Sequence, residues 1–532
     1  MKDWHTDETE WDMIVIGGGI TGAGLALEAA RRGVKVLLVE QRDFAWGTSS
    51  RSSKMVHGGL RYLVQGKFGL TRESVRERQR LLDEAPGLVE PLKYLYLFRK
   101  GAFPNRYVFD FVLNIYGFFA KQRDHKYFGK AHVQNFLPGV KADDLLGATQ
   151  YTDALTDDSR LVMRLLHEAR HFGASALNYV KVTELNKQGG QVTGVRALDG
   201  RTGKPVEFHA KVVVNATGAW ADRLRSQVRD EKRVRPLRGS HITVPSWRLP
   251  VHQAIGFNHP GDGRVMFICP WQGVTMIGTT DLDHEDDLDV EAAITNAETQ
   301  YLLAGAIGQF PDAKITREDI LTTWSGVRPI VSEEGVDPKT IKPSAARRDH
   351  IVWSDEGLIT VTGGKLTTFR IIALDVLAKV GEKLGLRDFV DNDAPIFTKP
   401  TPKPIPKMKR FGPAMTRKLH GYYGANLEAL INGAKEDELC YVAGTQTLWA
   451  ELRWCAANEA VAHLDDLLLR RTRLGFLLPK GGAGEMQKIR TICKEELGWK
   501  TRRWNTEWKN YQEIWHSKYS LPEIDETTNK RG

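Results

Sequence analysis

The sequence has few cysteines. The four that are present, Cys269, Cys440, Cys455 and Cys493, lie far apart, without a Cys-x-x-Cys motif and without a histidine at metal-binding spacing. Disulfide frameworks and zinc sites need closely spaced cysteines. The pattern therefore predicts reduced thiols in a cytosolic compartment and no metal site.

Long apolar runs are missing as well. No segment reaches the roughly 18 to 20 apolar residues that span a bilayer, and the polar, acidic N-terminus is unlike a signal or transit peptide. The most apolar stretch, residues 107–120, is flanked by basic residues and would leave one narrow polar stripe on a helix. It predicts either a helix lying in a membrane interface or a helix buried between domains.

Charge of one sign does not dominate either. The 532 residues carry 75 Lys and Arg against 66 Asp and Glu, a net charge of +9 on a mixed surface. Anionic partners fit this balance, but a basic patch studded with aromatic residues, as in nucleic-acid-binding proteins, is absent. The length predicts two or three domains.

The clearest motif lies near the N-terminus. In MIVIGGGITGAGLALEAARRGVKVLLVE, an apolar run precedes Gly17, Gly19 and Gly22, a helical pattern follows, and a second apolar run ends at Glu40. Glycines at this spacing allow a pyrophosphate to approach the backbone and a helix N-terminus, and an acid after the second strand can bind a ribose hydroxyl. The unit predicts a bound adenine dinucleotide, either NAD(P) or FAD.

Two more glycine turns follow apolar strands, NATGAW at 215–220 and VTGGKLTTF at 361–369. A nicotinamide enzyme usually needs one such turn, whereas a flavin buried along its length needs several. A late helix N-terminus suits the pyrimidine edge of a flavin, where reduction builds negative charge. The three turns favour FAD, bound without a covalent link.

Six motifs in order, IGGGITGAG, TSSRSSKMVHGGLRYL, NATGAW, RGSHITVP, WSGVRP and GGKLTTFR, together resemble the FAD-dependent glycerol-3-phosphate dehydrogenases, within the D-amino-acid-oxidase-like flavoproteins. The resemblance implies FAD contacts for residues of all three turns and of the segment from Thr48. These are Gly17, Gly19, Gly22, Glu40, Thr48, Ser49, Ser50, Lys54, His57, Gly58, Val180, Ala216, Thr217, Gly218, Gly363, Gly364, Lys365, Leu366 and Thr367.

The resemblance also implies a substrate pocket. Four residues would bind the phosphate and hydroxyl groups of glycerol 3-phosphate: Arg61, Tyr62, Arg328 and Arg348. Arg347 is adjacent to Arg348, and either of the two could supply the positive charge. Without the resemblance, Arg61 and Tyr62 would be an ordinary surface arginine stacked on an aromatic ring. Arginine suits a phosphate because its planar fork donates two hydrogen bonds at once.

The implied reaction oxidises sn-glycerol 3-phosphate to dihydroxyacetone phosphate, with hydride passing from C2 to FAD. His241 would remove the hydroxyl proton and Lys365 would polarise the oxygen, although their roles can be exchanged. Electrons would pass to a membrane quinone, or to O₂ in an oxidase. A more distant alternative is an amine or amino-acid oxidase of the same fold, and a non-catalytic flavoprotein would lack the pocket residues.

The expected architecture is an α/β protein with a glutathione-reductase-like FAD-binding domain, a mostly antiparallel substrate domain and a C-terminal helical domain. It would be a peripheral protein on the cytoplasmic side of a bacterial inner membrane, or cytoplasmic, and a homodimer is compatible with its helical domain. The expected boundaries are 10–80, 148–234 and 346–397 for the FAD-binding domain, 81–147 for a membrane-facing cap, 235–345 for the substrate domain, 398–407 for a Pro-rich linker, 408–500 for the helical domain and 501–532 for a tail.

Overall fold

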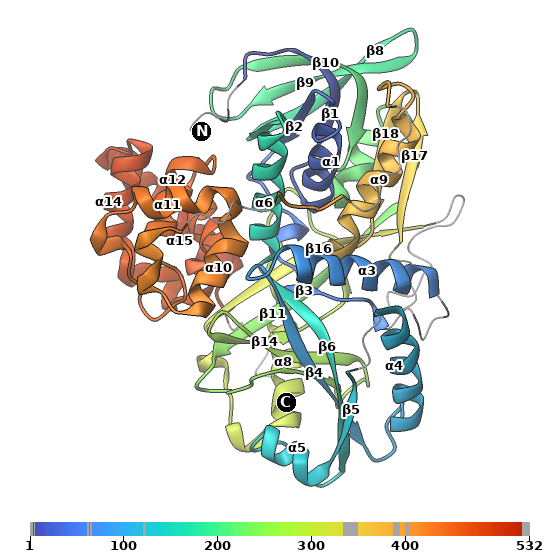
Figure 1. The fold of residues 1–532 in the computed structure, drawn as a ribbon, viewed down its shortest axis with the longest axis vertical. Helices are drawn as coiled ribbons and strands as arrows, with labels where there is room; N and C mark the ends of the chain where they lie inside the picture. The colour runs from blue at the N-terminus through green and yellow to red at the C-terminus, as the bar shows by residue number, and fades with distance from the viewer. Residues whose placement is uncertain are drawn as a thin grey trace.

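The computed structural model describes residues 4, 6–60, 63, 66, 68–120, 124–332, 349–386, 394–398 and 404–523. Two β-sheets follow one another along the long axis of the molecule, and the C-terminal helices form a separate group beside them (Figure 1). Half of the expected Pro-rich linker, residues 399–403, lies outside the described residues.

The first sheet has a parallel centre. Its spatial order is β17 (His350–Asp355), β18 (Leu358–Gly363), β10 (Pro205–Asn215), β1 (Glu10–Ile16), β2 (Val36–Glu40) and β7 (Ser175–Asn178), with β8 (Val180–Gln188) and β9 (Gln191–Asp199) as an antiparallel arm on β10. The strands from β18 to β7 all run parallel. Parallel strands bring their carboxyl ends to one edge, so the turns after β1, β10 and β18 meet there.

The central strands are buried on both faces, as their continuous apolar runs predict. One face packs against α1 (Ile20–Ala30), α6 (Asp158–His171) and α9 (Phe369–Val380). The other face packs against the arm formed by β8 and β9. This arrangement confirms the predicted α/β class.

The second sheet is almost entirely antiparallel. Its order is β15 (Leu282–Asp283), β11 (Val234–Pro245), β14 (Val274–Gly278), β13 (Val265–Trp271), β12 (Ala254–Asn258), β4 (Val89–Arg99), β6 (Leu145–Thr156) and β3 (Met55–Val56), with β16 (Thr322–Val331) on β11 and β5 (Lys126–Gly129) on β6. Its core also includes apolar side chains from α5 (Lys130–Phe136) and α8 (Asn296–Gln309).

Strands of this sheet begin in the segment that was predicted to form a membrane-facing cap. Strand β4 lies within residues 81–147 and β6 begins at the end of that segment, and both belong to the second sheet. The apolar pattern of β4 indicates a strand, but its partner lies about fifty residues away. Sequence periodicity alone does not identify such a distant partner.

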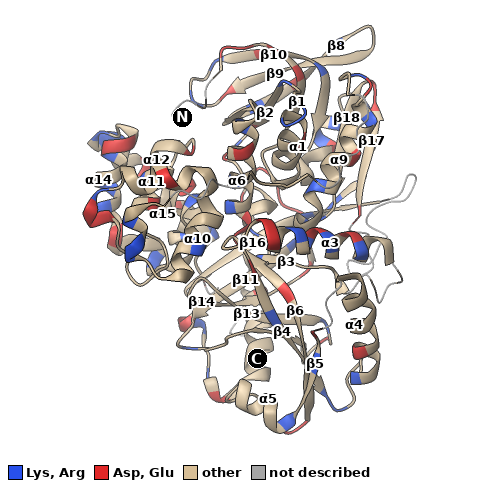
Figure 2. Ribbon diagram, viewed as in Figure 1, with Lys and Arg blue, Asp and Glu red and all other residues tan. Residues whose placement is uncertain are grey.

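Helix α4 (Arg106–Ala120) packs on this sheet near α3 (Phe68–Glu84) through one face only. Phe109, Leu113 and Tyr116 are buried, whereas Tyr107, Phe111 and Phe118 are 78%, 65% and 67% exposed. Figure 2 shows few charged residues along this helix. The segment is therefore not buried between domains, and its outer face is apolar.

Across the described residues, we find no helix that is both long and apolar enough to cross a membrane.

The C-terminal region is helical, as expected, and extends further than the sequence indicated. Its helices are α10 (Pro413–Tyr423), α11 (Leu427–Gly433), α12 (Trp449–Asn458), α13 (Leu474–Leu477), α14 (Met486–Leu497) and α15 (Thr501–Lys518). Helix α15 falls in the expected tail, yet its Trp504, Tyr511 and Trp515 are buried in the core of the helical group.

Candidate active site

The first glycine turn requires the absence of side chains. Gly17 has a φ of +116°, and a Cβ added there would lie 2.6 Å from the carbonyl oxygen of Ala216. A Cβ on Gly22 would lie 1.9 Å from the carbonyl oxygen of Gly17. Helix α1 begins at this turn after Gly19, which has no side chain to cap it, and the first turn of the helix holds no acid, so its N-terminal dipole favours an anion.

Glu40 braces this turn. One carboxylate oxygen accepts a hydrogen bond from the Gly18 amide at 2.7 Å, and the other accepts one from the Arg42 amide at 2.9 Å. Burial raises the pKa of Glu40. Because a carboxylate can accept about four hydrogen bonds, a ribose hydroxyl can still bind beside these amides.

A cavity of about 1050 Å³ opens along the edge where the three turns meet. It extends from the first turn to the second sheet, so residues of both sheets line it. Of the predicted cofactor residues, those lining it are Gly17, Gly19, Glu40, Thr48, Ser49, His57, Val180, Ala216, Thr217, Gly218, Gly363, Gly364, Lys365, Leu366 and Thr367. Gly22, Ser50, Lys54 and Gly58 are not among its lining residues.

Lys54 lies behind the cavity wall. Its ammonium group donates to both oxygens of Asp158 at 2.9 Å and to the Ser50 carbonyl at 2.6 Å, and its side chain is fully buried. Burial and the nearby Arg473 lower the pKa of Lys54 to about 7. Lys54 therefore pairs with the buried Asp158 and is not among the residues that line the cavity.

The serine-rich segment 49–53 is held in place by hydrogen bonds of its hydroxyl groups. Ser49 Oγ accepts from the Ile20 amide at 2.9 Å, at the start of α1. Ser52 Oγ donates to Asp158 at 2.7 Å, and Ser53 Oγ is 3.0 Å from Nε2 of His241. These contacts explain why the sequence concentrates serines here.

Arg328 lies on β16 at the far end of the cavity. Its guanidinium donates to Asp281 at 3.0 Å and to Thr279 at 3.2 Å. A Cβ on Gly239 would lie 2.4 Å from this guanidinium, so the glycine of the RGSH motif makes room for it. Arg264 also lines the cavity and lies 3.5 Å from Asp281. Two arginines around one carboxylate leave a net positive charge.

His241 on β11 is 1% exposed and does not itself line the cavity. Its ring stacks on Trp324, with 5.0 Å between the ring centroids, and Ser53 separates its Nε2 from the cavity. Burial lowers the pKa of His241 well below its usual range, and the charges of Arg328 and Lys54 add to this effect.

Lys365 follows β18 and lines the cavity on the side of α3. Its ammonium group donates to Ser74 Oγ at 2.6 Å. Among the described residues, no hydrogen bond or ring contact joins Lys365 to His241. Arg61, Tyr62 and Arg348, as well as Arg347, lie outside the described residues.

Sequence reasoning missed several lining residues. Arg264, Thr279 and Asp281 surround the predicted Arg328, and Tyr94 and Tyr151 form an aromatic wall with ring centroids 5.1 Å apart. The sequence GTTD, where a strand ends in polar residues, was a signal for Thr279 and Asp281. Tyr94 and Tyr151 gave none, because they become neighbours only when β4 pairs with β6.

Comparisons with known proteins place this site in a family. Residues 12–370 match the family described as FAD dependent oxidoreductase, and residues 399–504 match the C-terminal domain of alpha-glycerophosphate oxidase. The aerobic glycerol-3-phosphate dehydrogenase of Staphylococcus haemolyticus is 34% identical over 92% of this chain and 90% of that protein. The enzyme of the same name from Staphylococcus aureus is 34% identical over 87% and 86%.

Solved structures agree. The glycerol-3-phosphate dehydrogenase from Bacillus halodurans, complexed with FAD, has a TM-score of 0.75 and 28% identity, and the match covers 97% of each chain. The L-alpha-glycerophosphate oxidase from Mycoplasma pneumoniae, at 19% identity and a TM-score of 0.55, covers 71% of this chain and 96% of that one and shares the fold.

The chain therefore belongs to the FAD-dependent oxidoreductases. Within them it is a member of the aerobic glycerol-3-phosphate dehydrogenase family. Its cofactor is FAD, and the glycine cradle fits that group, because side chains at Gly17 and Gly22 would close the space where the backbone approaches a pyrophosphate.

The cradle yields a direct prediction. We expect Gly22→Ala to raise the Kd for FAD by about tenfold or more, because the added Cβ collides with the Gly17 carbonyl. Titrating the apoprotein with FAD and following flavin fluorescence measures this change. Gly129→Ala is the matched control, since a Cβ there meets nothing within 4 Å. An unchanged Kd in the Gly22 variant would show that this turn does not hold the cofactor.

Proposed function

We propose that the protein oxidises sn-glycerol 3-phosphate to dihydroxyacetone phosphate and passes the electrons to a membrane quinone. The observation that carries this proposal is the cationic end of the cavity, where Arg328 and Arg264 flank Asp281. It shares one cavity with the glycine turns that cradle FAD. A small dianion bound there would lie beside the cofactor.

Arg328 is positioned to bind the phosphate. Asp281 and Thr279 hold its guanidinium in the cavity, and Gly239 leaves the space that the guanidinium occupies. A planar guanidinium donates two parallel hydrogen bonds to phosphate oxygens. Arg264 adds a second positive charge, which offsets the loss of water around a dianion.

Oxidation of C2 needs the removal of one hydride and one proton. FAD, when bound, accepts the hydride that leaves C2 of the substrate. Ser53 Oγ reaches the cavity, and His241 Nε2 lies 3.0 Å behind it. The hydroxyl proton therefore passes through Ser53 Oγ to Nε2, which acts as the base, while the C–O single bond becomes a carbonyl. Lys365 supplies a positive charge on the other side of the cavity.

The surface of α4 supports a membrane acceptor. Its exposed face carries Tyr107, Phe111 and Phe118, with Arg106 at its start. Apolar rings next to basic residues bind the interface of anionic membranes. This surface supports a peripheral position for the enzyme on the cytoplasmic face of the inner membrane.

One observation favours a second candidate, an oxidase that passes electrons to O₂ and releases hydrogen peroxide. Residues 399–504 match a domain family described from alpha-glycerophosphate oxidase. The substrate pocket would be the same in both enzymes, so the acceptor has to be tested separately.

The phosphate assignment predicts a binding defect. We expect Arg328→Lys to lower kcat/KM for glycerol 3-phosphate by about 100-fold, because lysine keeps the charge but loses the fork. Arg248→Lys is the control, since Arg248 lies in the same sheet domain, pairs with Asp319 and does not line the cavity. Equal kinetics in the two variants would remove Arg328 from the substrate site.

The base assignment predicts a pH profile. Since burial holds the pKa of His241 well below its usual range, the ring stays neutral, and able to accept a proton, from pH 8 down to about pH 6. The anaerobic rate of flavin bleaching by substrate should be flat over this range and fall below it. Ser53→Ala and His241→Gln should each slow bleaching by about 100-fold. A rate that already falls between pH 8 and 7 would argue for another base.

Membrane binding by the exposed face of α4 can be tested by substitution. We expect the combined Tyr107→Ser, Phe111→Ser and Phe118→Ser variant to bind anionic phospholipid vesicles about tenfold more weakly, or worse, because three exposed rings are lost. Trp247→Ser, which removes a ring that is 76% exposed elsewhere on the surface, should bind the vesicles normally.

The electron acceptor is tested by reoxidation. Reoxidation of the substrate-treated enzyme should be faster with a short-chain quinone than with O₂. The reverse preference would establish the oxidase.

A further inference from the structure

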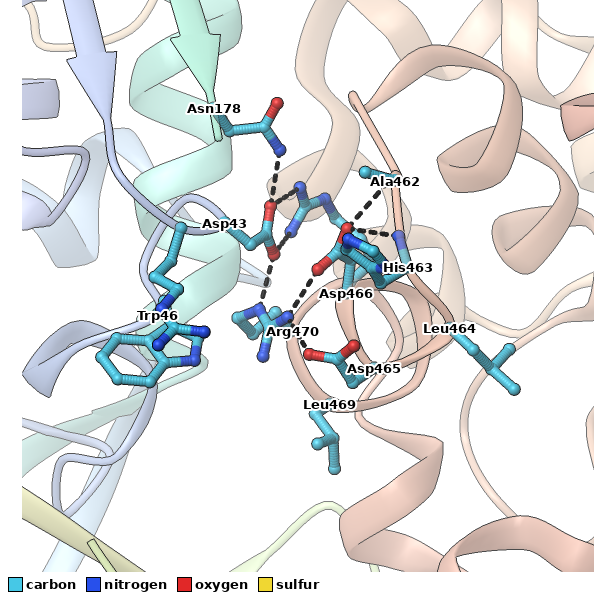
Figure 3. A network of polar contacts seen from close by, with 12 residues as sticks. Asp43, Trp46, Asn178, Ala462, His463, Leu464, Asp465, Asp466, Leu469 and Arg470 are labelled. Carbon is cyan, nitrogen blue, oxygen red and sulfur yellow. Dashed lines mark hydrogen bonds and ion pairs between the residues drawn. The ribbon is translucent and has the colours of Figure 1, made fainter. Parts of the chain in front are cut away.

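The C-terminal helical domain touches the cofactor loop through buried arginines. The loop runs from residue 41 to residue 54, between β2 and β3, and much of it lines the cavity. A π-helical turn, Asp466–Arg471, places Arg470 and Arg471 against this loop. Figure 3 shows Asp43 of the loop facing Arg470, which is bonded in turn to Asp465 and Asp466.

Asp43 is fully buried and receives four hydrogen bonds. Arg471 donates to its two oxygens at 2.6 and 2.8 Å, Arg470 donates at 2.5 Å, and Asn178 donates at 3.0 Å. Burial alone would raise the pKa of Asp43, but Arg471 and Arg470 outweigh burial and lower it to about 2. The carboxylate is therefore fixed in place by charges from the C-terminal domain.

The residues that follow Asp43 connect it to the first glycine turn. The amide of Ala45 donates to the Gly18 carbonyl at 2.9 Å, and a Cβ on Gly18 would lie 2.9 Å from the Phe44 ring. Trp46 then lines the cavity. A shift of Asp43 would thus move the residues that pack on the dinucleotide turn.

Arg473 provides a second attachment. It donates to the Ser50 carbonyl at 3.2 Å and to Asp157 at 3.1 Å, and it also pairs with Asp158. The neighbouring Ser49 accepts from the first amide of α1. Both ends of the cavity-lining part of the loop are therefore tied to the C-terminal domain.

We propose that the C-terminal helical domain is part of the cofactor site, and that Arg470, Arg471 and Arg473 are positioning residues that hold the 41–54 loop in its FAD-binding shape. None of the three lines the cavity, so they act through Asp43 and Ser50. The inference rests on the FAD cofactor and is independent of the proposed substrate and electron acceptor.

The test compares two isosteric changes in buried acids. Asp43→Asn weakens the attachment of the loop, whereas Glu438→Gln weakens a buried ion pair with Arg453 inside the C-terminal domain, at 2.6 and 2.7 Å. With apoprotein of each full-length variant, FAD titration should show a Kd raised about tenfold or more for Asp43→Asn. Glu438→Gln should change the Kd less than about twofold.

Hydrogen exchange separates positioning from general instability. At saturating FAD, backbone amides of the 41–54 loop should exchange faster in the Asp43→Asn variant than in the Glu438→Gln variant. The comparison is made where the two variants have lost a comparable amount of Tm. If Asp43→Asn yields no folded protein, Arg471→Lys, which keeps the charge but loses the fork, carries the test with the same expected direction. A parental Kd in the folded loop variant, or an equal rise in the control, would overturn the proposal.

Discussion

The structure depends on a close approach between two strand ends. The turn after β1 passes the turn after β10 so tightly that a methyl group on Gly17 would meet the carbonyl of Ala216 at 2.6 Å. Such an approach is available only to glycine, and only where parallel strands end at the same edge. The cavity, the orientation of α1 and the path of the 41–54 loop all follow from it.

The structure also depends on two clusters in which a pair of arginines shares one partly or fully buried aspartate. Arg328 and Arg264 share Asp281, and Arg470 and Arg471 share Asp43. In the first cluster the excess positive charge faces the cavity, where a phosphate can complete it. In the second cluster the charges face the protein and fix a loop, because a buried carboxylate is stable only when paired.

Much of this architecture follows from local sequence patterns. The apolar run before Gly17, the helical spacing after it and the two later glycine turns predict a parallel sheet with a dinucleotide at its edge. The structure has that sheet, and a cavity lies along the edge where the three turns meet. The role predicted for Arg328 came instead from the order of six motifs, and the choice of FAD came from the number of glycine turns together with that order. Periodicity alone would have left NAD(P) and FAD open.

What sequence could not predict involves contacts between distant segments. Strand β4 reads as a strand, but nothing local shows that it pairs with β6 rather than forming a separate cap. Lys54 was predicted to lie along the flavin, and no local pattern indicated that its ammonium group also pairs with Asp158, about a hundred residues away. Likewise, α15 was taken for a tail, since its buried Trp504 and Trp515 have meaning only once the helical group has assembled.

The proposed function rests on one event, the oxidation of a phosphorylated alcohol beside FAD. The most direct measurement mixes FAD-loaded protein with glycerol 3-phosphate anaerobically and follows the visible flavin absorbance. We expect glycerol 3-phosphate to bleach the band and glycerol to leave it unchanged, because Arg328 has to bind a phosphate. Absorbance that is unchanged by glycerol 3-phosphate, or bleached equally by the unphosphorylated alcohol, would contradict it.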